Sequence, residues 1–435
     1  MDQHLRRILT VDNRWLEGEP RGAWIGRHLP AAFVPRRLRL EVDDRVVVVV
    51  GPRQSGKSTL IWKTLESGRD TLYLNCEEPS LRQWLRSPAA FLADLEEWLG
   101  AIPDLFFEEI QHLDEAGLFL KGLADRRTGR HIFATGSSSF DFESATRESL
   151  AGRARRHLLL PLSLQEIVTA FDYPAAVRET RIEQAIERLA MFGGYPAVYS
   201  EKDPRELLAS LVEAFVVRDA SDRFRIQHTA AFRRILELAA SQVGNLVNAS
   251  EWAALVGVSN DTVAEYVRLL EETHVLRLVR PFVGGKRAEL TSARKIFFLD
   301  NGIRNQLFGG FARLADRPDR GALLENFVFT ELAKSTHPLL DTLSYWRSKS
   351  GAEVDFVVQH QGRLLACEVK AGDARGKISR SARSFVEAYS PEILLITSQE
   401  PHPQTTIGTT PVRFVSLAEL GPTVERFVGE PDFYR

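Results

Sequence analysis

A run of five valines that leads directly into a glycine-containing loop constrains this chain more than any other feature. Val46–Val50 is followed by Gly51-Pro52-Arg53-Gln54-Ser55-Gly56-Lys57-Ser58-Thr59, which matches the pattern G-x-x-x-x-G-K-[ST]. A buried strand, such a loop and a following helix place backbone N–H groups around phosphate oxygens. The alternative is a chance glycine-rich turn, but the strand before the loop and the helix after it favour a phosphate-binding loop.

All nine residues from Gly51 to Thr59 are expected to line the phosphates of ATP. Lys57 is expected to reach the β- and γ-phosphates, and the hydroxyl of Ser58 to ligate Mg²⁺. The matching carboxylates follow the strand-like run Leu105–Glu108. Glu108 is predicted to hold Mg²⁺, directly or through water, and Glu109 to orient or deprotonate the attacking water. A solvated charge pair at a strand end is the alternative.

Two polar segments further along are weaker candidates for the same site. Ser137 or Ser138 follows the strand-like run Ile132–Thr135 and is predicted to contact the γ-phosphate or the water, with a hydroxyl-rich turn as an equal alternative. Arg153 follows Gly152 and is a candidate arginine finger for the ATP of a neighbouring subunit. A lone arginine is more often only a surface charge.

Changes of pattern divide the chain into segments. Strand-like runs alternate with helical runs over 41–165, which predicts a mostly parallel sheet covered on both faces. The predicted segments are an N-terminal arm (1–40), an α/β core (41–165), a helical lid (166–243), a winged-helix-like unit (244–308) and a second α/β unit (318–435). The polar stretch 310–320 is expected to be a linker. The predicted fold class is therefore α/β multidomain.

The second α/β unit holds a constellation of acids and one lysine. Glu368 and Lys370 are two apart on a predicted strand and so share a face, and a hairpin would bring Asp355 beside them. Asp355 and Glu368 are predicted to ligate Mg²⁺ or Mn²⁺, which activates water against a phosphodiester. Lys370 would position that water or neutralise the transition state, and Glu325, on the helix Ala322–Lys334, completes the catalytic set. By itself this pattern also arises by chance.

A basic segment follows a predicted recognition helix, Asp261–Arg268. Between Arg277 and Arg320 there are ten Lys/Arg and four Asp/Glu residues, a local balance of +6, although the whole chain carries −2. A basic stripe on a winged helix is the footprint expected for contact with DNA phosphates. The alternative is a winged helix that serves protein contacts or covers an ATPase core, and Glu271-Glu272 would repel phosphate if it shared that face.

Composition narrows the class of protein. Cys76 and Cys367 are too few for a disulfide framework or a cysteine-rich zinc site. No apolar run approaches the roughly 20 residues of a membrane helix, and no secretory signal precedes the first segment. We therefore expect a cytoplasmic protein without a membrane partner.

Several motifs occur in a fixed order. They are Gly51–Leu60, Glu108-Glu109-Ile110-Gln111, Thr135-Gly136-Ser137-Ser138, Ser149–Arg153, Leu160-Pro161-Leu162-Ser163 and Gly193-Gly194-Tyr195-Pro196. Together they resemble the bacterial and archaeal AAA-type P-loop ATPases that carry a C-terminal DUF4143 domain, which is similar to the PD-(D/E)XK nuclease fold. The resemblance implies a ring-shaped homo-oligomer, for example a hexamer, in which Arg153 acts on a neighbour. One departure from the family pattern is Glu108, where the family usually has Asp. The resemblance therefore predicts nucleotide binding more firmly than it predicts the geometry of Mg²⁺ coordination.

These observations predict an ATP-dependent DNA-processing enzyme. An oligomeric ATPase would drive metal-dependent phosphodiester cleavage on branched DNA, as in junction migration and resolution, in repair or in defence. The alternative is a regulatory ATPase switch that carries a winged helix and a catalytically inert nuclease-fold binding module.

Overall fold

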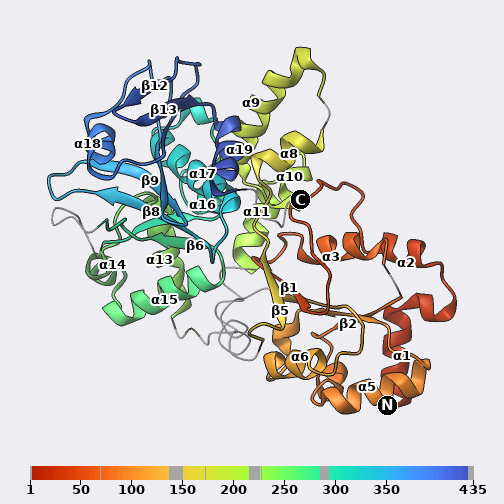
Figure 1. The fold of residues 1–435 in the computed structure, drawn as a ribbon. Coiled ribbons are helices and arrows are strands. Elements are labelled where there is room, and N and C mark those ends of the chain that lie inside the picture. Colours follow the sequence, from red (N-terminus) through yellow and green to blue (C-terminus); the bar gives the residue numbers. More distant parts are fainter. Residues whose placement is uncertain are drawn as a thin grey trace. The chain divides into compact units, whose positions relative to one another are not determined.

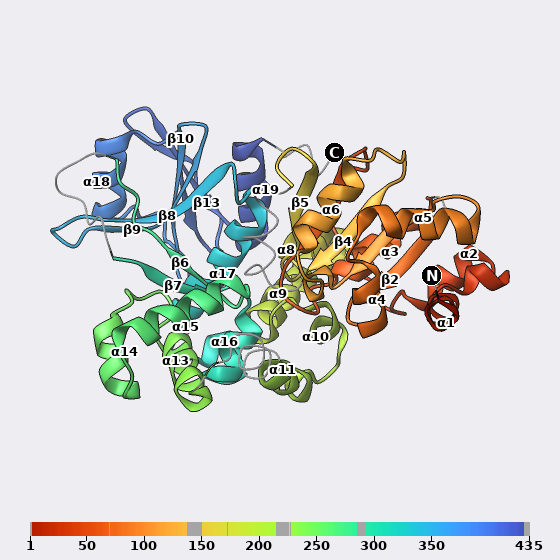
Figure 2. The same cartoon turned by 90° about the horizontal axis from the view of Figure 1, so that it is seen from below.

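The computed structural model describes residues 2–68, 70–136, 150–171, 173–214, 226, 228–284 and 293–429. The chain divides into two compact units, which we describe one at a time (Figures 1 and 2). The first consists of residues 1–160 with 272–274, and the second of 161–271 with 275–435. The division falls inside the motif Leu160-Pro161-Leu162-Ser163.

The first unit is built on a parallel five-stranded sheet, in the order β2-β3-β4-β1-β5. Its strands are β1 (Val46–Val50), β2 (Thr71–Asn75), β3 (Asp104–Glu108), β4 (Ile132–Gly136) and β5 (Ala154–Leu158). The sequence-based prediction of a parallel α/β sheet is confirmed. The β1 strand lies between β4 and β5, so its backbone is paired on both sides and the loop after it starts from a fixed point.

Helices cover both faces of this sheet, which explains the unbroken run of valines in β1. Val46, Val48 and Val50 join one apolar cluster, and Val47 and Val49 join the other. The helices are α1 (Gln3–Asp12), α2 (Arg21–Arg27), α3 (Lys57–Leu65), α4 (Pro79–Trp84), α5 (Pro88–Leu99) and α6 (Ala116–Ala124), with short 3₁₀ turns at Arg14–Glu17 and Ile110–His112.

Two helices of the predicted N-terminal arm pack into this unit. Leu5 and Leu9 of α1 are buried in the cluster that contains Val46, and Trp24 and Ile25 of α2 are buried in the cluster that contains Val47. Burial of side chains of this size contributes about 1.5–3 kcal/mol each. The segment before β1 therefore contributes apolar side chains to both sides of the core of the first unit.

The second unit begins with helices. They are α8 (Leu164–Ala170), α9 (Ala175–Phe192), α10 (Pro196–Ser200), α11 (Arg205–Leu211), α13 (Thr229–Ser241), α14 (Ala249–Val256) and α15 (Asn260–Glu272), followed by strands β6 (Leu276–Val279) and β7 (Lys295–Phe298), helix α16 (Asn301–Leu307) and a 3₁₀ turn, η4 (Leu314–Asp316). The β6 and β7 strands pair antiparallel. Helices α14 and α15 are separated by a turn in which the Ser259 hydroxyl accepts a hydrogen bond from the Thr262 N–H at 3.1 Å.

The Gly193-Gly194 pair lets two elements of this unit approach closely. A Cβ atom on Gly193 would lie 2.0 Å from the Asp300 carboxylate, and one on Gly194 would lie 2.3 Å from the Leu162 carbonyl oxygen. Asp300, buried at the start of α16, accepts hydrogen bonds from the N–H groups of Gly194 at 2.7 Å and Gly302 at 2.8 Å. This glycine motif therefore serves packing within the second unit.

The predicted linker at 310–320 is wrong for its C-terminal half. Arg317 is buried and makes two hydrogen bonds of 2.8 Å to Asp319, which also pairs with the buried Arg304 at 2.5 Å. Burial would raise the pKa of Asp319, but the hydrogen bonds from Arg317 and Arg304 outweigh it and lower the pKa to about 2. The polar composition of this stretch reflects an ion-pair cluster that fixes it to α16.

The C-terminal part is a mixed six-stranded sheet, in the order β12-β13-β11-β10-β9-β8. Its elements are α17 (Arg320–Ser335), β8 (Asp341–Arg347), β9 (Glu353–His360), β10 (Arg363–Glu368), α18 (Arg380–Tyr389), β11 (Ile393–Thr397), β12 (Thr405–Ile407), β13 (Thr410–Val415) and α19 (Leu417–Val428). The β8, β9 and β10 strands form an antiparallel meander, whereas β10, β11 and β13 are parallel.

Within the described residues, no helix combines the length and the apolar character needed to cross a bilayer.

Candidate active sites

The loop after β1 has the backbone shape expected for a phosphate cradle. Gly51 and Gly56 adopt positive φ angles of 147° and 94°, and Gln54 has a φ of 56°. A Cβ atom on Gly51 would lie 2.2 Å from the Leu159 carbonyl oxygen, so only glycine fits there. The α3 helix starts at Lys57, so its unpaired N–H groups face the loop.

The Lys57 side chain is buried in this loop. Its ammonium group donates hydrogen bonds to the carbonyl oxygens of Pro52 at 2.9 Å and Gly51 at 3.2 Å. Burial lowers the pKa of Lys57 to about 8, although Glu109 and Glu108 favour its charged form. An anion in the loop would offset that burial, which is the role of a phosphate.

Two further observations show that the loop suits a polar ligand. The Ser55 hydroxyl is fully buried and, among the described residues, has no hydrogen-bond partner. Arg36 donates a hydrogen bond to the Ser55 carbonyl oxygen at 2.8 Å and to the Leu160 carbonyl oxygen at 2.5 Å, and so holds the loop against the chain after β5. No sequence motif pointed to Arg36, because this residue lies before β1 and outside any recognised pattern.

Glu108 lies at the end of β3 and contacts the loop residue that was predicted to share its metal ion. The Ser58 hydroxyl donates a short hydrogen bond to one oxygen of Glu108, and the Tyr73 hydroxyl donates one to the other. A serine hydroxyl and a carboxylate are oxygen ligands of the kind that Mg²⁺ prefers, so Ser58 and Glu108 fit the ion. Burial, together with the charge of Glu108, raises the pKa of Tyr73, so the phenol remains a donor.

Glu109 comes directly after the β3 strand in a left-handed conformation, with a φ of 52°. Its N–H donates to the Thr135 hydroxyl at the end of β4, at 3.0 Å, and its carboxylate accepts a hydrogen bond from the Gln111 amide. The turn that follows β3 thus points Glu109 away from the strand direction and fixes it through β4.

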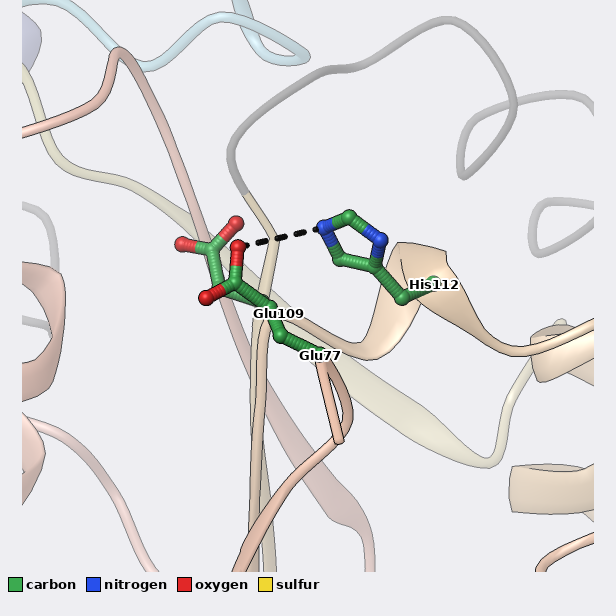
Figure 3. A group of neighbouring side chains, drawn as sticks. All are labelled: Glu77, Glu109 and His112. Carbon is green, nitrogen blue, oxygen red and sulfur yellow. Dashed lines mark ion pairs between the residues drawn. The ribbon is translucent and has the colours of Figure 1, made fainter. Parts of the chain in front are cut away.

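The structure also brings Glu77 and His112 next to Glu109. Their potential ligand atoms all lie within 4.8 Å of one another, and His112 Nε2 is 3.4 Å from Glu77 Oε1. Figure 3 shows the two carboxylates beside each other with the imidazole ring facing them. No sequence motif predicts this group, because Glu77 follows β2 and is far from Glu109 and His112 along the chain.

Of the weaker candidates for the ATPase site, the structure describes Arg153 but not Ser137 or Ser138. Arg153 is partly exposed and pairs with Asp125 of its own chain. A finger role in a neighbouring subunit would require Arg153 to leave that pair. Ser137 and Ser138 lie outside the described residues, so their predicted role stays a prediction.

The second constellation forms around the ends of β9 and β10. The register pairs Cys367 with Phe356, which brings the next residues, Glu368 and Asp355, to the same position on adjacent strands. Asp355 accepts a hydrogen bond from the Val369 N–H at 2.6 Å. Glu368 accepts hydrogen bonds from the Lys370 ammonium and, at 2.9 Å, from the Ser379 hydroxyl.

Glu325 belongs to a neighbouring ion-pair group. Lys295 of β7 lies 3.0 Å from a Glu325 oxygen and 2.5 Å from a Glu353 oxygen. Burial disfavours the charged form of Lys295, but these two carboxylates outweigh it and raise its pKa. Neither Lys295 nor Glu353 was predicted to take part in the nuclease-like site.

Charge repulsion makes this cluster suited to a cation. Burial, followed by the charge of Glu325, raises the pKa of Asp355 well above its ordinary value. Burial also raises the pKa of Glu325. A divalent cation against Asp355 and Glu368 would offset that repulsion, so the residues fit a hard metal ion.

The basic segment does not form one exposed stripe. Lys295, Arg304 and Arg317 are buried in ion pairs, and Arg313 pairs with Glu187 at 3.0 Å. Lys286 and Arg287 lie outside the described residues. A charge count along the sequence cannot distinguish buried basic residues from exposed ones. The prediction of one continuous basic stripe is therefore wrong for Lys295, Arg304 and Arg317.

Comparisons with known proteins divide the chain in a similar way. Residues 43–168 match the AAA_14 family model, described as an AAA domain; residues 183–314 match DUF8612 and residues 320–415 match DUF4143, both described as domains of unknown function. The first unit therefore carries an AAA-type ATPase domain, and a DUF4143 domain follows in the second.

Alignments with curated relatives cover most of this chain. Uncharacterized protein Rv2008c of Mycobacterium tuberculosis is 28% identical over 345 residues, which cover 78% of this chain and 73% of the relative. Uncharacterized protein MJ1544 of Methanocaldococcus jannaschii is 24% identical over 351 residues, 77% of each chain. A solved chain from a study of katanin self-assembly is 14% identical over 48% of this chain and 68% of its own, with a TM-score of 0.23.

Proposed function

We propose that this chain is an ATP-dependent DNA-processing enzyme, in which ATP hydrolysis in the first unit drives metal-dependent phosphodiester cleavage in the second. The observation that carries the ATPase assignment is the contact of Ser58 and Glu108 beside a glycine loop that holds a buried Lys57. The observation that carries the nuclease assignment is the grouping of Asp355, Glu368 and Lys370.

In the ATPase site, the loop N–H groups and Lys57 would hold the phosphates, and Ser58 with Glu108 would hold Mg²⁺. When bound, Mg²⁺ neutralises the charge that develops on the transferred phosphoryl group. Glu109, fixed by Thr135 and Gln111, would orient the attacking water and accept its proton. Arg153 would complete this site from a neighbouring subunit of a ring-shaped homo-oligomer such as a hexamer, after release from Asp125.

In the nuclease-like site, Asp355 and Glu368 would hold Mg²⁺ or Mn²⁺, which supplies an activated water and charge neutralisation when bound. Lys370 is partly exposed, with its ammonium on Glu368, so it can reach both the attacking water and a substrate phosphate. The order α17, β8, β9, β10, α18, β11, with the acids at the β9 and β10 ends, supports the nuclease-fold interpretation.

DNA contact is proposed for α14, α15 and the β6–β7 pair, a helix–turn–helix followed by a two-stranded sheet that supports a winged-helix interpretation. The exposed described arginines next to it are Arg280 and Arg294. We propose branched DNA as the substrate, in line with an ATP-driven machine that both remodels and cuts.

A second candidate function is a regulatory ATPase switch with an inert nuclease-fold module. Two observations favour it. The exposed positions of α15 between residues 261 and 268 carry the carboxylates of Asp261 and Glu265 and a single arginine, Arg268, which disfavours phosphate contact. The burial of Lys295, Arg304 and Arg317 also removes positive charge from the surface available to DNA.

Cleavage assays separate these functions. Labelled linear, single-stranded and four-way DNA would be incubated with Mg²⁺ or Mn²⁺, with and without ATP. The proposal expects cutting by the wild-type protein and loss of cutting in Asp355→Ala and Lys370→Ala, with ATP hydrolysis retained. Lys57→Ala is the matched control, because it should abolish ATP hydrolysis and leave the metal site of the second unit intact. Absence of cutting on every substrate would favour the switch.

A further inference from the structure

Lys295 is a buried cation that reaches the nuclease-like site from outside the DUF4143 match. It lies on β7, is 4% exposed, and its ammonium sits 5.5 Å from the centre of the Tyr345 ring. Burying an ammonium group costs several kcal/mol unless opposite charges compensate it. Glu325 and Glu353 supply that compensation at 3.0 and 2.5 Å.

The acids of this region therefore fall into two groups. Glu325 and Glu353 are committed to Lys295, whereas Asp355 and Glu368 are held by Val369, Lys370 and Ser379. The ligand atoms of Glu325, Asp355 and Glu368 do not form a group within 4.8 Å of one another. A metal ion that needs all three acids is thus disfavoured by their positions.

The charges of this region also favour a single divalent ion. The four carboxylates of Glu325, Glu353, Asp355 and Glu368 are balanced by two ammonium groups, Lys295 and Lys370, and one divalent cation. Arg347, 3.5 Å from Glu353, adds positive charge at the edge of the cluster. A second divalent ion would leave an excess of positive charge in a partly buried site, which is unfavourable.

We propose that Lys295 is a built-in cation of the nuclease-like site, which withdraws Glu325 and Glu353 from metal binding and limits the site to one divalent ion, on Asp355 and Glu368. This inference rests on the proposed nuclease function. It revises the catalytic role predicted for Glu325: Glu325 becomes a positioning residue that holds Lys295.

The test counts Mn²⁺ ions by electron paramagnetic resonance on the full chain, without nucleotide. Asp355→Asn and Glu368→Gln are each expected to lose one ion relative to the wild type. Glu325→Gln is expected to keep that ion, with an affinity within about threefold of the wild type, since it is not a ligand. Loss of the ion in Glu325→Gln would overturn the inference while leaving the nuclease site in place.

Lys295→Met is expected to add a second Mn²⁺ ion per chain, because Glu325 then loses its ammonium partner and Glu353 keeps only Arg347, at 3.5 Å. Lys334→Met is the matched control, since Lys334 is also a little-exposed lysine of the second unit, paired with Glu331 at 3.1 Å. The control should bind the wild-type number of ions. An unchanged count in a folded Lys295→Met protein would contradict the proposal.

If Lys295→Met does not fold, the triple variant Lys295→Met, Glu325→Gln, Glu353→Gln removes the whole ion-pair group. It is expected to retain one ion with an affinity within about threefold of the wild type. Loss of that ion would overturn the inference. Failure of the proposed nuclease function would give a different result. If neither Asp355→Asn nor Glu368→Gln changes the number of bound Mn²⁺ ions, no ion binds at these acids.

Discussion

At the scale of single residues, Glu108 shows how a one-methylene change is accommodated. Its longer side chain reaches the Ser58 hydroxyl with one oxygen and the Tyr73 hydroxyl with the other. The sequence predicted the first partner, because strand ends of a parallel sheet meet beside the loop. The sequence did not predict that Tyr73 and Arg36 contribute to the ATPase site or that Lys295 contributes to the nuclease-like site. Each of the three lies outside the motifs and far along the chain from the residues it contacts.

We expect Glu108→Asp to slow ATP hydrolysis, although the sequence resemblance led us to expect Asp at this position. The shorter side chain cannot keep both hydroxyl contacts, and loss of one hydrogen bond in the transition state corresponds to about a tenfold lower kcat. ATP binding should change little, because the loop and Lys57 are untouched. Steady-state hydrolysis assays and nucleotide titrations measure the two quantities, and a kcat above the wild-type value would refute this account of Glu108.

Gly51→Ala is expected to destabilise the first unit by more than about 3 kcal/mol, because the new Cβ atom would meet the Leu159 carbonyl oxygen at 2.2 Å. Gly152→Ala is the matched control: Gly152 also has a positive φ, 73°, but no atom of the described residues lies within 4 Å of its added Cβ. Its cost should be about 1 kcal/mol of backbone strain. Chemical unfolding of both variants compares them, and equal losses would argue against the close contact.

At the scale of elements, the strands that position the sites could be predicted well. The runs expected from the sequence for β1 to β4 match the structure to within one residue, because each has an apolar centre; they are Arg45–Val50, Thr71–Asn75, Leu105–Glu108 and Ile132–Thr135. The run expected for the fifth strand, His157–Leu160, begins three residues after β5 and ends two residues after it. The β8, β12 and β13 strands were not expected, since their polar and threonine-rich sequences resemble loops. The expected strand Leu364–Lys370 is two residues too long at its end, since β10 stops at Glu368. It stops there because the N–H groups of Val369 and Lys370 donate to Asp355 and Thr397.

The ion-pair cluster of Arg304, Arg317 and Asp319, which fixes the segment after η4 to α16, gives a pH-dependent stability. The pKa of Asp319 is lowered to about 2, from an ordinary value of 3.8, so its contribution is present above pH 4 and is lost as the pH falls toward 2. Because Asp319 is partly exposed, we expect Asp319→Asn to cost about 1–2 kcal/mol at pH 7 and less at pH 3. Unfolding of the second unit at both pH values measures this difference. A cost that is the same at pH 7 and pH 3 would contradict the ion-pair explanation.

At the scale of the whole molecule, the two proposed sites lie in different compact units. The AAA domain contains the glycine loop, Ser58, Glu108 and Glu109, whereas the second unit contains Asp355, Glu368 and Lys370. The charge balance of −2 conceals this division, since many of the acids and bases are paired inside each unit. Sequence position alone could not reveal those pairs, because their partners meet only in the folded chain.

The central claim is that one chain both hydrolyses ATP and cuts DNA at separate sites. The most direct measurement follows ATP hydrolysis and cleavage of labelled four-way DNA in the same reaction, for the wild type, Asp355→Ala and Lys57→Ala. We predict that Asp355→Ala loses cleavage and retains hydrolysis, and that Lys57→Ala loses hydrolysis. Cleavage by Asp355→Ala at the wild-type rate would contradict the claim.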